Sequence, residues 1–194
     1  MTDRSRSWLN GTGIAAIIRS AIDAIRDDIG AVSVVGLGNS MGGFMALALS
    51  RDVAFDAVFA LTPQYSILPN EVPEETRWRY FRKRIETVHY PRADTFRPDR
   101  TKYFILHGSD ESELVHALRF PMANGVSHFI LPGCGHQLAS QMKRKGLLTP
   151  IVRDLIDGRY RRMRTRLNAL DAMRRIDFEA RRRTANQHLS IAAE

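Results

Sequence analysis

The strongest constraint on the fold lies in segment 34–43, which reads VVGLGNSMGG and carries Gly38, Ser40 and Gly42. It overlaps an apolar run at residues 31–37 that is rich in β-branched side chains and suits a strand buried on both faces of a parallel sheet. The residues after the serine have the composition of a helix. This context predicts a tight strand-to-helix turn with strained backbone. We expect side chains two places before and after the serine to collide there, so that both positions require glycine.

The rest of the chain alternates between helical and strand-like patterns. The expected elements, in order, are a helix at 14–29, a helix at 41–50, strands at 55–61 and 102–106, a helix at 111–120, a strand at 127–131 and a helix at 137–156. Gly146 and Pro150 should interrupt the last helix. Residues 63–100 hold five of the eight prolines and a helical-looking stretch at 73–88. The alternation predicts an α/β fold whose mostly parallel sheet has four strands and helices on both faces.

The sequence around Ser40 resembles the nucleophile elbow of the α/β-hydrolase superfamily, down to the SMGG that begins at the serine. The resemblance covers about residues 12–157. It implies an α/β-hydrolase-like fold with a reduced number of strands, because family members have about four further strands before this point. The implied organisation is a catalytic domain at 1–157, with a cap-like insertion at 63–100, followed by a basic helical or flexible tail at 158–194.

The resemblance also implies that Ser40 is the nucleophile and that the backbone N–H of Met41 is one donor to the oxyanion. In the family a second donor comes from a loop before the elbow strand, and nothing in residues 1–30 resembles that loop. Loss of one such donor costs about 10²–10³ in rate. We therefore expect the true start of the protein to lie upstream of Met1. Pairing with another subunit and loss of activity are the alternatives.

Two further residues complete the implied triad, in the family's chain order of serine, acid and histidine. Asp110 follows one predicted strand in the sequence LHGSD, and His136 follows the next on a glycine-rich loop. The carboxyl ends of parallel strands share one edge of the sheet. We therefore expect His136 to be the general base and Asp110 the residue that orients it. Glu111 and Glu113 are the alternative acids.

The same window also permits a dinucleotide-binding turn, because VVGLG opens many such domains. That motif needs G-x-G-x-x-G, and here Met41 stands in the place of the third glycine after Gly36 and Gly38. The acid expected about 20 residues later would be Asp56, which lies at the start of its strand rather than at its end. The sequence therefore disfavours a nicotinamide-dependent oxidoreductase.

The net charge of +8 comes almost entirely from the C-terminal part of the chain. Residues 159–183 contain ten arginines and three acidic residues, a net charge of +7. The same segment carries an apolar stripe of Tyr160, Met163, Leu167 and Leu170. The arginines suit an acidic partner or an anionic surface, and the stripe suits a neighbouring protein helix. The segment lacks the stacking aromatic groups of a nucleic-acid module, which disfavours nucleic acid as the partner.

Composition excludes several other classes. No apolar run approaches the roughly 20 residues of a membrane span, the N-terminus lacks the apolar core of a signal peptide, and the single Cys134 cannot form an internal disulfide. These features predict a cytoplasmic protein. No zinc-ligand spacing appears, and no metal or organic cofactor is implied. The sequence thus predicts a serine hydrolase that acts on a small-molecule acyl substrate, most simply a carboxylic ester. The rival hypothesis is a non-catalytic hydrolase-like protein that binds an acidic partner through its tail.

Overall fold

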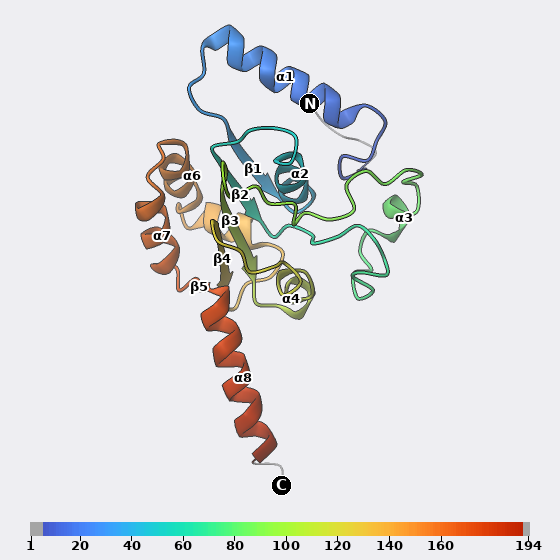
Figure 1. The fold of residues 1–194 in the computed structure, drawn as a ribbon. Helices are drawn as coiled ribbons and strands as arrows, with labels where there is room; N and C mark the ends of the chain where they lie inside the picture. The colour runs from blue at the N-terminus through green and yellow to red at the C-terminus, as the bar shows by residue number, and fades with distance from the viewer. Residues whose placement is uncertain (1–5, 192–194) are drawn as a thin grey trace.

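The computed structural model describes residues 6–191, and side chains are described for residues 6–187. Within this range the strands form one five-stranded sheet, β1-β2-β3-β4-β5 (Figure 1). They are β1 Val35–Asn39, β2 Ala57–Leu61, β3 Lys102–Gly108, β4 Val126–Leu131 and β5 Met173–Arg174. β1 to β4 run parallel, and β5 pairs antiparallel with β4. The predicted α/β class with a mostly parallel sheet is confirmed, and a fifth, short strand is added to the four expected.

The sheet is buried on both faces, as the apolar runs predict. Side chains along β2 and β3 alternate between two core clusters. Val58 and Ile105 point into the cluster that contains Phe44. Phe59 and Phe104 point into the cluster on the opposite face. Because neither face can be left in water, helices must cover both.

Two groups of helices cover these faces (Figure 1). The first cluster is covered by α1 Ile14–Ile29 and α2 Met41–Leu49, and the second by α5 Leu138–Arg144, α6 Leu148–Ile156 and α7 Tyr160–Asn168. Helix α4 Glu111–Ala117 packs beside β4. None of the helices in the described range is long and apolar enough to span a membrane.

The helix expected at 137–156 is two helices, α5 and α6. Gly146 adopts a positive φ of 68° between them, a left-handed conformation that ends a helix at little cost to glycine. Pro150 lies in the first turn of α6, where its missing N–H removes no intrahelical hydrogen bond. The expected break is therefore confirmed, and glycine rather than proline causes it.

The insertion at 63–100 is mostly irregular. The helix expected at 73–88 is wrong, because only α3 Arg79–Arg82 is helical there. Polar side chains satisfy the backbone instead: Glu75 accepts a hydrogen bond from the Arg77 N–H at 2.7 Å, and the Arg82 guanidinium donates to the Glu75 carbonyl at 2.7 Å. The segment is thus held by specific contacts rather than by helical periodicity.

The basic segment from residue 158 differs from the expected tail. Met163 and Leu167 of α7 are buried in the chain's own core, so part of the stripe assigned to a neighbouring helix covers this sheet. Asp154 forms ion pairs with Arg159 and Arg166 at 3.1 and 2.7 Å, which fasten α7 to α6. The last helix, α8 Arg175–Ile191, extends away from the body (Figure 1).

Candidate active site

The candidate catalytic residues follow three different parallel strands of the sheet. Ser40 follows β1, Glu113 lies in the helix after β3, and His136 follows β4. The parallel register aligns Asn39 with Leu61, so the strands end at one common edge of the sheet. The structure thus brings the predicted loops to the same side of the molecule.

Ser40 occupies the predicted strained turn. Its φ is 54° and its ψ −119°, a conformation that non-glycine residues rarely adopt. The turn persists because the Ser40 N–H donates to the Leu61 carbonyl at 2.8 Å and the Ser40 carbonyl accepts from the Phe44 N–H at 3.0 Å. Strain held in place by its surroundings is common at functional sites.

The glycines around Ser40 are not equivalent. A Cβ at Gly38 would lie 2.1 Å from the Gly42 carbonyl oxygen, so glycine is required there, as expected. A Cβ at Gly42 would meet nothing within 4 Å, so the expectation of a collision at that position is wrong. Gly43 is instead the second crowded position, with a Cβ placed 3.2 Å from the Leu61 carbonyl oxygen.

This asymmetry predicts opposite effects of two matched substitutions. Gly38→Ala should lower the free energy of unfolding by about 2 kcal/mol or more, because backbone atoms cannot move aside easily. Gly42→Ala should leave stability unchanged or raise it by about 0.5–1 kcal/mol, because alanine favours the helix. Urea unfolding of both variants measures this difference. Equal destabilisation by both would contradict the geometry.

His136 is oriented by Glu113. Its Nδ1 lies 2.8 Å from Glu113 Oε1, and its side chain is 28% exposed whereas that of Glu113 is 2% exposed. A carboxylate accepts a hydrogen bond from Nδ1–H, which places the lone pair of a neutral imidazole on Nε2. Nε2 is the atom that a general base would present to a serine.

Asp110, the acid expected from the sequence, occupies a different place. It is the residue before α4 and makes no side-chain cap hydrogen bond to that helix. Its Oδ2 instead lies against Gly135, 2.0 Å from where a Cβ at that position would stand. Of the carboxylates among the described residues, the one hydrogen-bonded to His136 is that of Glu113, which the sequence offered as an alternative.

Glu113 is linked to residues of the insertion through a network of ion pairs and hydrogen bonds. The Arg77 guanidinium contacts Glu113 Oε1 at 3.4 Å and Glu75 Oε2 at 2.6 Å. The Tyr65 N–H donates to His116 Nδ1 at 3.2 Å, so His116 Nε2 carries hydrogen and donates to Glu75 at 2.9 Å. These contacts join the insertion to α4 through Arg77 and Glu75.

The pKa of Glu113 follows from this network. Burial by itself would raise it, but the hydrogen bond from His136 and the Arg77 charge hold the pKa below its usual value. Glu75 behaves alike: burial opposes ionisation, but the hydrogen bonds from His116 and Arg77 lower its pKa strongly. Both carboxylates are therefore ionised at neutral pH.

The Ser40 hydroxyl faces a residue that sequence reasoning missed. Ser40 Oγ accepts a hydrogen bond from Gln64 Nε2 at 3.0 Å, and Gln64 Oε1 accepts one from Trp8 Nε1 at 3.3 Å. Within residues 6–187 no hydrogen bond joins Ser40 to His136. The backbone N–H of Met41 begins α2 and has no intrahelical acceptor, as for any first helical residue.

A second buried relay ends on the same segment. His107 Nε2 lies 2.9 Å from the Pro63 carbonyl, which can only accept, so this nitrogen carries hydrogen. His107 Nδ1 then accepts from His128 Nε2 at 3.0 Å, and His128 Nδ1 faces the Arg175 guanidinium at 3.5 Å. The two histidines are therefore neutral, and the relay ties the base of α8 to the residue before Gln64.

Burial lowers the pKa of His107 from 6.5 to about 4 and also lowers that of His128. Between pH 6.5 and about 4 the histidine of the unfolded chain is protonated, whereas the buried histidine of the folded chain stays neutral. The free energy of unfolding should therefore fall as the pH drops through this range. The loss is roughly 3 kcal/mol for His107 alone. Urea unfolding at several pH values tests this, with His107→Gln expected to flatten the profile. Stability that stays constant or rises toward pH 4 would contradict it.

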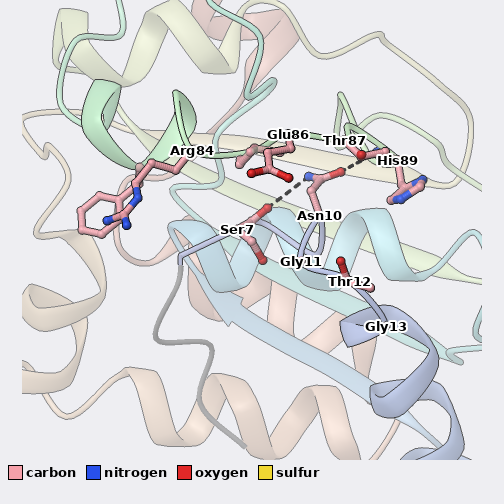
Figure 2. A pocket seen from close by; sticks show the side chains of 11 residues that line it. Ser7, Asn10, Gly11, Thr12, Gly13, Arg84, Glu86, Thr87 and His89 are labelled. Carbon is pink, nitrogen blue, oxygen red and sulfur yellow. Dashed lines mark hydrogen bonds between the residues drawn. The ribbon is translucent and has the colours of Figure 1, made fainter.

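A cavity of about 440 Å³ lies apart from these residues (Figure 2). Its lining includes Ser7, Asn10, Thr12, Arg84, Glu86 and His89, and it does not include Ser40 or His136. Asn10 joins the two segments that form it: its Nδ2 donates to the Ser7 and Trp8 carbonyls at 3.1 and 2.9 Å, and its Oδ1 accepts from the His89 N–H at 2.7 Å. Residues 6–187 contain no group of three or more His, Cys, Asp or Glu side chains placed to hold a metal ion.

Comparisons with known proteins give distant structural matches. No protein-family model matches the chain, and no curated protein matches it. An alpha-beta serine hydrolase homologue from Coxiella burnetii matches with a TM-score of 0.43 and 9% identity, over 77% of this chain and 61% of that one. A thermophilic esterase from Thermogutta terrifontis, solved with malate bound, matches with a TM-score of 0.45 and 14% identity, over 74% of this chain and 72% of that one. The chain thus spans less than two thirds of the first structure.

Proposed function

We propose that this chain, whose parallel sheet and glycine-flanked serine turn are those of a reduced α/β-hydrolase fold, is a serine hydrolase that acts on a carboxylic ester. The observation that supports this most is the strained Ser40 turn at the sheet edge that also carries the His136–Glu113 pair. A serine hydroxyl is a weak nucleophile unless a base takes its proton. The arrangement supplies such a base and a buried carboxylate to orient it.

The proposed reaction proceeds through an acyl-enzyme. Ser40 Oγ attacks the carbonyl carbon while His136 Nε2 takes the hydroxyl proton, and Glu113 stabilises the imidazolium that forms. The tetrahedral intermediate collapses when His136 returns the proton to the leaving alcohol. Water then attacks the acyl-Ser40 ester by the same route and releases the acid. Ser40 Oγ must turn toward His136 as the substrate binds, which is common because catalytic hydrogen bonds are often loose before binding.

Pre-steady-state kinetics with p-nitrophenyl acetate tests this proposal. A burst of p-nitrophenolate of about one equivalent per chain, followed by slower steady turnover, is expected if an acyl-enzyme accumulates. Slow acylation would remove the burst, but steady turnover above the buffer rate would remain. A purified, folded chain that shows neither would contradict the proposal and favour the non-catalytic alternative.

A further inference from the structure

The side chain of Gln64 has no role in the triad, yet it contacts the proposed nucleophile. Gln64 lies just after β2, is 2% exposed, and donates from Nε2 to Ser40 Oγ at 3.0 Å. A buried amide aimed at one hydroxyl is a costly arrangement unless its hydrogen bonds are satisfied. Its partners therefore determine what it can do.

Trp8 fixes which end of the Gln64 amide faces the serine. An indole nitrogen can only donate, so the Trp8 Nε1–H requires Gln64 Oε1 as its acceptor. The amide NH₂ group is consequently turned toward Ser40. Trp8 is 1% exposed and has a left-handed backbone conformation, and its carbonyl accepts a hydrogen bond from Asn10. Asn10 also accepts a hydrogen bond from the His89 N–H of the insertion (Figure 2).

The position of Nε2 suits a developing negative charge. The oxyanion of a tetrahedral intermediate forms on the carbon that is bonded to Ser40 Oγ, hence two bonds from the atom that Gln64 now contacts. An amide nitrogen carries two hydrogens, so Nε2 can follow the charge from Oγ to the oxyanion with a small movement. Side-chain amides are established donors of this kind.

We propose that the Gln64 amide is an oxyanion donor that acts together with the Met41 backbone N–H. The inference rests on the proposed function and deepens it. In the attack step the Ser40 Oγ–C bond forms, the hydroxyl proton passes to His136, and the carbonyl electron pair moves to the oxygen that Gln64 and Met41 stabilise. Trp8 is a positioning residue, because it acts through the orientation of the amide.

Gln64→Met tests the proposal, because methionine keeps the length of the side chain and removes the donor. The expected result is a fall in kcat of about 10²–10³ for p-nitrophenyl acetate with little change in KM, as for loss of one oxyanion donor. The inhibition constant of an aryl trifluoromethyl ketone, which forms a hemiketal oxyanion on a serine, should rise by about the same factor. Gln141→Met makes the same chemical change beside Cys134 and should leave kcat within about twofold.

Trp8→Phe is a second variant that tests the same proposal if Gln64→Met does not fold. It keeps a buried ring and removes the indole donor, so kcat should fall by about tenfold, in step with weaker ketone binding. Folded Gln64→Met or Trp8→Phe chains with unchanged kcat and ketone affinity would overturn the oxyanion role. If the wild-type chain turns over the ester and the variants match it, only the oxyanion role of Gln64 is wrong and the serine-hydrolase proposal remains. If the wild-type chain neither turns over the ester nor binds the ketone, both proposals are wrong.

Discussion

Replacing Ser40 with alanine is expected to lower kcat for an activated ester by about 10⁴-fold or more, because no other group can form the acyl-enzyme. The fold should survive, since the conformation of the turn depends on backbone hydrogen bonds to Leu61 and Phe44 that alanine retains. Steady-state kinetics and circular dichroism of the variant check both parts. Activity within tenfold of the wild type would remove Ser40 from the chemistry.

Glu113→Gln is expected to lower kcat by about 10³–10⁴-fold, because an amide can donate to His136 Nδ1 and hold the ring in the wrong tautomer. Asp110→Asn is the matched control, since it makes the same change one helical turn earlier, where the carboxylate faces Gly135. We expect it to cost less than tenfold. Kinetics of the two variants under the same conditions compare the acids directly, and a larger loss for Asp110→Asn would restore the assignment drawn from the sequence.

The sequence predicted the parts of the site that depend on local pattern. The GxSxG between an apolar run and a helix located the turn, and the tight approach of Gly38 to Gly42 gives the physical reason for its first glycine. The alternation of elements likewise located four parallel strands. These features depend on neighbours within a few residues, which a single sequence displays.

The acid could not be chosen in the same way. Asp110, Glu111 and Glu113 lie within one helical turn, and which of them faces His136 depends on the direction in which α4 leaves β3. Leu114 and Ala117 of α4 pack against Ile130 of β4, and this contact between residues distant in sequence holds the helix in its direction. The hydrogen-bonded series from Trp8 through Gln64 to Ser40 joins residues 56 and 24 positions apart, and no local pattern signals it.

The sequence did not reveal which side chains of the C-terminal segment are buried, for a related reason. Its arginines dominate the composition, whereas its few apolar residues decide its position. Met163 and Leu167 cover the sheet, and the strand Met173–Arg174 extends it. The net charge of this segment reflects its exposed arginines and does not indicate which of its apolar side chains are buried.

Active-site labelling tests the central claim most directly. The wild-type chain is incubated with a fluorophosphonate probe, digested, and mapped by mass spectrometry beside Ser40→Ala and Gln141→Met. We predict one probe per chain on the peptide that contains Ser40, the same labelling in Gln141→Met, and none in Ser40→Ala. Labelling that persists in Ser40→Ala, or a folded wild-type chain that takes up no probe, would contradict the assignment of Ser40 as the nucleophile.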